Sequence, residues 1–514
     1  MSVWTRLRPS LGIGVLALLL ASCASAPPQR TQPPLPAAWF GPAGTAPDGA
    51  DAARLAQWWQ QFDDPQMHAL VDAALSRNLD VQSALAELRL ARAQLRGASA
   101  ALWPVLDGSG QASRQWLDLG DALDGEDNPL GDLLGGEGNT ELDSWQLALQ
   151  ASWELDLFGA NRLRREAGAL RLGAAQAQLV AARLAVAGNV AQAYVQARGL
   201  LAQMTLLDAG IDNALALERV ANARFELGEV TRLDVESTAA QRAALQAQRG
   251  DLDAAIAETT FAIDTLTDRP PGSTRAMLGD AGDVPRASSS IPLGQPVDLL
   301  RRRPDVIAAA AELDASERNA LASRRDLFPK LAVNASYGRS GLALGDAISS
   351  ASTLRSAAAQ LAFPWLDFGA TRAAIDEADA QADAGFVGLR QAIAAALEEV
   401  EVANAQRHAR QRQLERRDDA LARGEEALRM ARRSYEVGIS DLDAVLQAQE
   451  GALQARRDRL ETEVALATAQ IALYTALGGG WQADPAAPGS LEAVGRELLD
   501  APVPDRIRQP ESGA

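Results

Sequence analysis

The stretch WELDLFGANRLRR, residues 153–165, contains the point at which a strand pattern changes into a helix pattern. From Trp145 to Leu155, apolar residues occupy alternate positions, which is the period of a strand with two different faces. After Gly159 the chain is dominated by Ala, Leu, Gln, Arg and Glu, which favour helix. Because no proline occurs again before Pro270, we expect one helix over residues 160–226, roughly 100 Å long at a rise of 1.5 Å per residue.

The same junction occurs a second time as FPWLDFGATR, residues 363–372. Four residues recur 210 positions later: Phe158, Gly159, Ala160 and Arg162 match Phe368, Gly369, Ala370 and Arg372. We therefore expect a second long helix over residues 370–436. The chain consists of two copies of one unit, each a strand pair followed by a very long helix.

Each long helix pattern is interrupted at a glycine, first at Gly228 and then at Gly438. A glycine supplies the positive φ that ends one helix and allows the next to fold back. We expect returning helices over residues 231–267 and 441–477. Each repeat then has a hairpin of strands at one end and a helical turn about 100 Å away at the other.

These patterns divide the chain into six parts. The expected parts are a lipoprotein signal peptide (1–22), a Pro/Gly-rich tether (23–63), the first repeat (64–271), a Pro/Gly/Ser linker (272–297), the second repeat (298–477) and a flexible tail (478–514). In the first repeat a helix from about 64 to 101 precedes a hairpin over residues 102–156, whose strands flank a long exposed loop. In the second repeat the hairpin covers residues 328–366.

The composition suits thin walls of closely packed helices. Hydrophobic residues make up 47% of the chain, but many are alanine and only 4% of residues are aromatic, so a thick globular core is not expected. The net charge of −18 argues against nucleic acid as a partner.

The N-terminus has the features of a bacterial lipoprotein signal. Arg6 and Arg8 precede an apolar run over residues 11–20 that is too short to span a membrane as a stable helix. Cys23, the only cysteine in the chain, follows Leu20-Ala21-Ser22. We expect cleavage before Cys23 and acylation of that residue, although an ordinary secretory signal with an incidental cysteine remains the alternative. Because each buried methylene contributes about 0.8 kcal/mol, several acyl chains anchor a protein firmly.

The four predicted strands have the length and flanking residues of membrane strands. At about 9–12 residues they match the length of a tilted spanning strand. Five tryptophans lie in or beside them, where a membrane interface selects aromatics: Trp103, Trp116, Trp145, Trp153 and Trp365. Strands span lipid only as a closed barrel, so four strands require several copies of the chain. The alternative is a soluble sheet with a tryptophan core.

Residues for catalysis or metal binding are sparse. The two histidines, His68 and His408, lie among polar neighbours at helical positions, and no nucleophile–base pair or metal cluster is evident. The triplet at residues 367–369 spells the kinase DFG motif but lacks the accompanying phosphate loop, so we interpret it as strand-to-helix punctuation. We expect neither an enzyme nor a bound cofactor.

Four motifs together resemble the outer-membrane efflux family, and most closely its lipidated branch of TolC-like channel components. They are WELDLFG with RLRR, RRRPDV at residues 301–306, LFPKL at 327–331 and YEVG at 435–438. The resemblance covers nearly all of the mature chain. It implies a homotrimer with a 12-stranded barrel in the outer membrane and an α-helical tunnel in the periplasm. It also implies a periplasmic adaptor and an inner-membrane pump as partners.

The resemblance also implies functional residues at the far helical turns. Aspartates line the aperture of the family's closed tip, and the candidates here are Asp234, Asp441 and Asp443. The alternative is that all three are only helix caps. The resemblance places adaptor contacts at Gly228, Tyr435, Val437, Gly438 and Ile439.

The predicted function is therefore a passive conduit that exports small molecules across the outer membrane. The rival interpretation is a lipid-anchored periplasmic coiled-coil spacer that does not span the membrane. In the conduit, the side of the strand with Trp145, Leu147 and Leu149 should face lipid, and the side with Gln146 and Gln150 should face the lumen.

Overall fold

The computed structural model of the protein describes residues 35–41, 55–118, 139–279, 282–287, 291–344, 348–364 and 366–481. The chain divides into two units, Met1–Leu35 and Pro36–Ala514. All the elements described below belong to the second unit.

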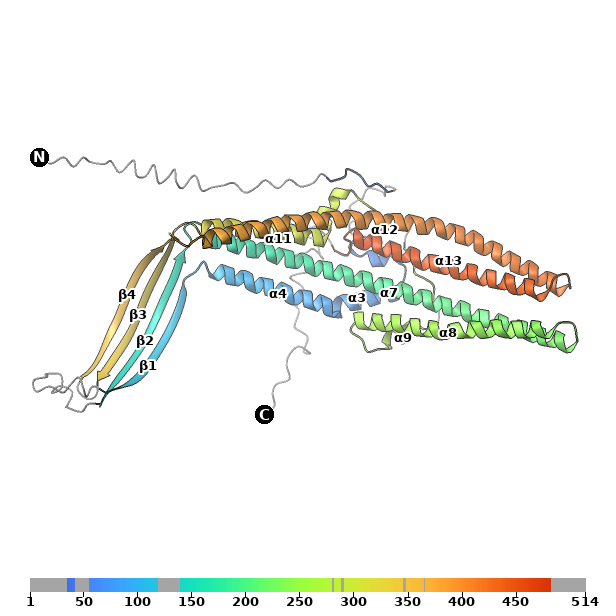
Figure 1. Cartoon of the computed structure of the whole chain (residues 1–514), viewed down its shortest axis with the longest axis horizontal. Coiled ribbons are helices and arrows are strands. Elements are labelled where there is room, and N and C mark those ends of the chain that lie inside the picture. Colours follow the sequence, from blue (N-terminus) through green and yellow to red (C-terminus); the bar gives the residue numbers. More distant parts are fainter. Residues whose placement is uncertain are drawn as a thin grey trace, which may run out of the picture. The chain divides into compact units, whose positions relative to one another are not determined.

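Two pairs of long helices dominate this unit (Figure 1). In the first repeat α7 (Ala160–Glu226) is followed by α8 (Arg232–Leu266), and in the second α12 (Ala370–Glu436) is followed by α13 (Leu442–Ala476). α7 and α12 each have 67 residues, and α8 and α13 each have 35. α7 and α12 cover the residues expected from the sequence, and α8 and α13 begin and end within one residue of the expected bounds.

Shorter helices precede or connect these pairs. They are η1 (Trp58–Gln61), α3 (Pro65–Arg77), α4 (Leu79–Ala100), α9 (Ser273–Leu278), η2 (Pro296–Asp298), α10 (Leu299–Arg302) and α11 (Pro304–Arg325). α4 and α11 both have 22 residues and occupy the same position in the two repeats. Both pack against α7, and α11 also packs against α12.

Four strands form one antiparallel sheet in the order β1-β2-β3-β4. Their bounds are β1 (Val105–Asp118), β2 (Asn139–Leu155), β3 (Lys330–Leu344) and β4 (Ile348–Ala362). β2 and β3 pair although they come from different repeats, so the two hairpins form a continuous sheet. The prediction of strands of about 9–12 residues was too short, because the strands have 14–17 residues.

The helical wall is built from small residues, which allow close approach. A Cβ at Gly199 would lie 2.5 Å from Cγ2 of Val464, and a Cβ at Gly188 would lie 2.8 Å from Cγ2 of Thr475. Both glycines are in α7 and both contacts are with α13, so these two helices touch at a separation that admits no side chain at these positions.

The single predicted helix from about 64 to 101 is interrupted at Asn78, which separates α3 from α4. The Asn78 side chain accepts hydrogen bonds from the N–H groups of Asp80 and Val81, so it caps α4. Its Nδ2 donates to the carbonyl oxygen of Leu266, at the end of α8, over 3.0 Å. The break thus ties the beginning of α4 to the end of the returning helix.

Arg303 occupies the corresponding place in the second repeat, 225 positions later. Its guanidinium is buried and donates to the carbonyl oxygen of Ala476, at the end of α13, over 3.0 Å. It also donates to Glu399 of α12 and to Asp305 of α11, each at 2.6 Å. This single side chain therefore joins three helices.

Three predicted boundaries differ from the structure. The tether was placed at 23–63, but Trp58 and Phe62 are fully buried, and Trp58 stacks on Tyr474 with ring centroids 5.7 Å apart. The tail was placed at 478–514, but Trp481 is buried and its Nε1 donates to Arg302. The linker at 272–297 contains α9, whose beginning is held by the Asp264 carboxylate.

Candidate membrane sheet and helical turns

The register of the sheet separates a polar face from an apolar one. Residues directly opposite each other in antiparallel strands share a face. One face is rich in Ser, Gln and Asn, and its serines pair across strands: Ser113 with Ser144, Ser336 with Ser356, and Ser340 with Ser352. The other face carries large apolar side chains from all four strands: Leu106, Trp145, Leu147, Leu149, Trp153, Val333, Tyr337 and Leu361.

The apolar face is exposed in the single chain. Leu147 is 66% exposed and Leu149 is 48% exposed. Contiguous exposed apolar surface of this kind marks a membrane or protein interaction site. Gln146 and Gln150 lie on the polar face, so the two sets of side chains that the sequence assigns to lipid and lumen are on opposite sides of the sheet.

Both edges of the sheet lack a partner strand among the described residues. β1 pairs with β2 alone, and β4 pairs with β3 alone. An unpaired edge presents a row of N–H and C=O groups. In lipid each unsatisfied group costs several kcal/mol, so this sheet spans a membrane only if its edges are paired.

The described tryptophans of the hairpin regions do not form a core. Trp103 and Trp116 are each 72% exposed, which contradicts the alternative of a soluble sheet with a tryptophan core. Trp153 Nε1 donates to the carbonyl oxygen of Leu102, and Trp116 Nε1 donates to Glu141. Their rings are therefore held at the two ends of the first hairpin. Trp365 lies outside the described residues.

An aspartate caps each strand-to-helix junction. Asp156 accepts hydrogen bonds from the N–H groups of Asn161 and Arg162 at the beginning of α7. Asp367 accepts from the N–H groups of Gly369 and Thr371 at the beginning of α12. The Thr371 side chain and the N–H groups of Thr371 and Gly369 together lower the pKa of Asp367. The contacts of Asp367 confirm that the DFG triplet marks the change from strand to helix.

The two far turns have the same backbone geometry. Gly228 and Gly438 have φ values of 74° and 76°. In each turn the glycine N–H donates to the residue three positions earlier, and the next N–H donates to the residue five positions earlier. This is the Schellman arrangement, which favours glycine at the left-handed position.

The side chains at these turns are partly exposed and partly buried. Val437 and Ile439 are 64% and 82% exposed, and Leu227, the counterpart of Val437, is 73% exposed. Tyr435 was expected to contact an adaptor, but it is buried in a cluster with Ala221, Leu442 and Val445. Its ring also lies 4.3 Å from the Arg224 guanidinium. The phenol therefore supports the turn from inside instead of forming its surface.

The three candidate aperture aspartates lie at the beginnings of the returning helices. Asp234 accepts from both the N–H and the hydroxyl of Thr231, each at 2.7 Å, which closes a capping box on α8. These bonds lower the pKa of Asp234. Asp441 is the N-cap of α13 and accepts from the Ala444 N–H over 3.0 Å. Asp443 lies in the first turn of α13.

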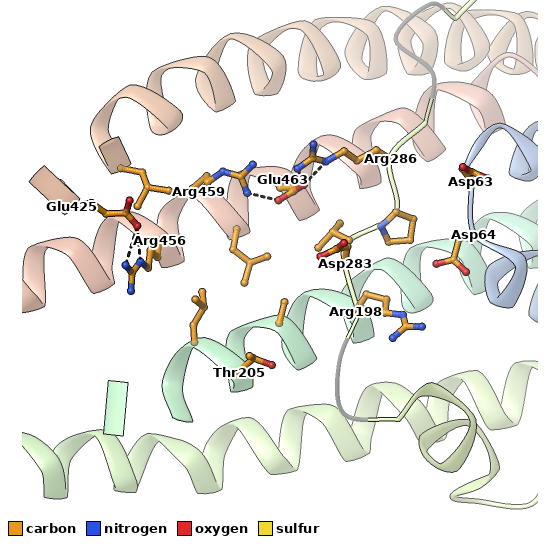
Figure 2. Close-up of a pocket in the computed structure, with 17 residues that line it drawn as sticks. Asp63, Asp64, Arg198, Thr205, Asp283, Arg286, Glu425, Arg456, Arg459 and Glu463 are labelled. Atoms are coloured by element: carbon orange, nitrogen blue, oxygen red, sulfur yellow. Dashed lines mark hydrogen bonds and ion pairs between the residues drawn. The ribbon is translucent and has the colours of Figure 1, made fainter. Parts of the chain in front are cut away.

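A cavity of about 920 Å³, not anticipated from the sequence, lies along α7 and α13 beside residues 282–286 (Figure 2). Three of its arginines are held by carboxylates: Arg456 by Glu425, and Arg286 and Arg459 by Glu463. On the opposite wall Asp64 accepts from the Tyr194 hydroxyl over 2.7 Å. Burial and this bond raise the pKa of Tyr194. The ion pair between Arg286 and Glu463 therefore fastens the connecting segment to α13.

Within the described ranges, no group of three or more His, Cys, Asp or Glu residues could hold a metal ion.

None of the helices in the part of the chain that the structure describes combines the length and the apolar character needed to cross a membrane.

Comparisons with known proteins identify relatives across both repeats. A family model described as outer membrane efflux protein matches residues 70–267 and 296–479. The pyoverdine export outer membrane protein OpmQ of Pseudomonas putida is 31% identical over 481 residues, which cover 91% of this chain and 97% of that protein. The solvent efflux pump outer membrane protein SrpC of Pseudomonas putida is 30% identical over 482 residues, covering 91% and 97%. The solved structure of the outer-membrane channel OprN is similar with a TM-score of 0.74 and 28% identity, covering 89% of this chain and 99% of that one.

Proposed function

Because this chain belongs to the outer membrane efflux protein family, we propose that three copies of it close into one channel through which a partner pump expels small molecules. The protein is an efflux component of the outer membrane. The proposal concerns its assembly, its partners and the residues that serve them.

The observation that carries the proposal is an amphipathic sheet with two unpaired edges. Joining β4 of one copy to β1 of the next supplies each edge with a partner. Three copies would make a 12-stranded barrel with its apolar face toward lipid and its serine- and glutamine-rich face toward the lumen. The long helices would continue this ring into the periplasm as a tunnel of roughly 100 Å.

The far turns are the proposed contacts of the periplasmic adaptor, which links the channel to an inner-membrane pump. Val437, Gly438 and Ile439 form an exposed apolar turn, and Gly228 provides the equivalent backbone in the first repeat. Tyr435 acts indirectly because it is buried beneath the turn. Cargo choice would belong to the pump, since relatives of similar identity are named for pyoverdine export and for solvent efflux.

Lipidation at Cys23, which lies outside the described residues, would add a second attachment to the outer membrane. The mature protein should begin at Cys23 and carry acyl mass. Intact-mass analysis tests this, and cleavage elsewhere without added mass would refute it. Cys23→Ser should also reduce membrane partitioning during assembly.

A periplasmic spacer that never spans the membrane is the competing function. A spacer would use the long helices but has no need of a sheet with one exposed apolar face. Arginine at Leu149 should impair insertion if that face contacts lipid, whereas arginine at Gln150 should be tolerated. Equal effects at the two positions would favour the spacer.

The proposed adaptor contact at the far turns is tested by measuring export. Gly438→Trp should abolish export while trimer level and insertion stay normal. Because a side chain at φ 76° is strained, Ile439→Asp provides a second variant that keeps the glycine. Normal export by Ile439→Asp would remove the docking assignment.

The proposed aperture needs a variant that separates charge from helix capping. Asp234→Ala together with Asp441→Ala should raise conductance in planar bilayers. Asn at both positions removes the charge but retains a capping side chain. Raised conductance in both double variants would support a charged aperture, whereas a rise in the alanine variant alone would leave these aspartates as caps.

A further inference from the structure

Two arginines lie on the apolar face of the sheet, where a membrane protein rarely places charge. Arg339 of β3 is opposite Leu147 and Thr353, and Arg355 of β4 is opposite Tyr337. Both side chains are exposed. Since 339 and 355 are two residues apart in register on adjacent strands, their guanidinium groups are diagonal neighbours.

Neither arginine has a carboxylate partner in the described part of the chain. The only recorded interaction is that of Arg355, whose Cζ lies 5.5 Å from the centre of the Tyr337 ring. Arg114 on β1 provides a contrast on the same face, because it binds Asp143 at 2.7 Å and Glu141 at 3.5 Å. The first hairpin thus neutralises its outward arginine, whereas the second hairpin leaves two positive charges free.

The part of β1 between residues 105 and 116 offers this pair no carboxylate when the proposed ring closes. The strand placed beside β4 would be β1 of the next copy. Between residues 105 and 116, the side of β1 continuous with this face carries Leu106, Gly108, Gly110, Ala112, Arg114 and Trp116. These six residues offer no acidic group.

The height of the pair on the sheet corresponds to a membrane interface. Eight residues separate Leu331 from Arg339, about 27 Å along a strand at 3.4 Å per residue. The apolar band of such barrels is about 25 Å tall and their strands are tilted, so Arg339 lies near the band's loop-side rim. Trp145 is opposite Gly341, two residues farther toward the loops, and a Cβ at Gly341 would overlap its indole ring. Trp145 and Tyr337 are the aromatic residues expected at that rim.

We propose that Arg339 and Arg355 bind a phosphate group of a phosphorylated glycolipid in the outer leaflet of the outer membrane. An unpaired arginine facing hydrocarbon is costly, and a guanidinium forms bidentate, charge-assisted hydrogen bonds with phosphate. The pair would hold the headgroup while Trp145 and Tyr337 contact its sugar and upper acyl region. This inference rests on the proposed barrel, which directs this face toward lipid.

The test uses the full-length protein in detergent, with native mass spectrometry to count chains and bound lipids. The probe is purified lipid A, compared with the same lipid after enzymatic removal of its phosphates. Arg339→Gln with Arg355→Gln should weaken lipid A binding at least tenfold, and dephosphorylated lipid A should bind the wild type as weakly. Lysine at both positions should give an intermediate affinity, because it keeps the charge without the bidentate geometry.

The matched control removes two exposed arginines from the helices, Arg232→Gln with Arg423→Gln, and should leave lipid A affinity unchanged. Inorganic phosphate at millimolar concentration should not displace the lipid. Equal binding of lipid A by wild type and the Arg339/Arg355 glutamine variant would overturn the proposal, as would equal binding of the dephosphorylated lipid. The chain count in the same spectra reports separately on the trimer, so its failure would be distinguishable from loss of lipid binding.

Discussion

The junctions at Asn78 and Arg303 occupy equivalent places in the two repeats and solve one problem with different chemistry. Each lies before a 22-residue helix and donates a hydrogen bond to the last carbonyl of a returning helix, Leu266 in one repeat and Ala476 in the other. Those carbonyls are themselves 210 positions apart. The contact is therefore preserved between repeats although the residue type is not.

The difference lies in how many elements each side chain joins. Asn78 caps its own helix and reaches one other. Arg303 also lies between two helices, α10 and α11, but its side chain binds carboxylates of α11 and α12 as well as the end of α13. The neutral amide of Asn78 caps its own helix, whereas the buried guanidinium of Arg303 is a charged group that binds several helices. The second junction should thus be the more sensitive to truncation.

Truncating Arg303 should have the largest effect on stability. Arg303→Ala removes hydrogen bonds to three helices and should lower stability by about 2–4 kcal/mol. Arg303→Asn should be less damaging, because asparagine restores a cap like that of Asn78. The measurement is the apparent Tm of the helical circular-dichroism signal at one scan rate. If alanine and asparagine were equally damaging, the two junctions would not be equivalent.

The neutral junction should respond less. Asn78→Ala removes a helix cap and one buried hydrogen bond, and we expect a loss of about 1–2 kcal/mol. Gln82→Ala is the control, since its half-buried side chain donates to the nearby Arg77 carbonyl within the same segment. Comparing apparent Tm values at the same scan rate ranks the junctions. A larger loss for Asn78→Ala than for Arg303→Ala would reverse the comparison.

The helix crossing at Gly199 also distinguishes the repeats, because its counterpart 210 positions later is Ala409. Gly199→Ala forces a methyl against Val464, and overpacking should exceed the helix-propensity gain, for a net loss of about 1 kcal/mol. Gly250→Ala, in open space on α8, should instead stabilise by about 0.5–1 kcal/mol. Stabilisation by both substitutions would show that α7 and α13 have room to separate.

The smallest effect on stability should come from the capping box of Thr231 and Asp234, which the far turn of the first repeat has and that of the second repeat does not. The Thr231 bonds hold the pKa of Asp234 below its usual range. A carboxyl group whose pKa is lower in the folded state stabilises the fold at pH values above its unfolded pKa of about 3.9. This stabilisation is lost as the pH falls through the folded-state pKa. Asp234→Asn should therefore cost at most a few tenths of a kcal/mol at neutral pH, given its exposure. Thermal melts from pH 7 to pH 3 should show the difference in apparent Tm between the wild type and Asp234→Asn becoming smaller. A difference that grew on acidification would contradict this prediction.

Short-range signals explain which parts of the structure could be predicted from the sequence. The helix ends at Gly228 and Gly438 and the junctions at residues 156–159 and 366–369 depend on neighbours in the chain, so the family, the repeats and the long helices were predictable. Contacts distant in sequence were not. The break at Asn78 depends on a carbonyl 188 residues away, and the burial of Tyr435 depends on α7 and α13 packing around it.

The strands show the same limit. β1 and β4 are rich in Ser, Gly and Ala, whose strand preference is weak. Their full length follows from pairing with β2 and β3, so patterning underestimated it. The pairing of Arg339 and Arg355 on one face also requires the register between β3 and β4, which alternation within one strand does not supply.

Ring closure by three chains is the central claim, and native mass spectrometry of the detergent-extracted protein tests it most directly. The unpaired edges of β1 and β4 predict a complex of three chains that persists until the sheet unfolds. A folded single chain that retains the same strand content in detergent would contradict it, because its edges would then be stable without partners.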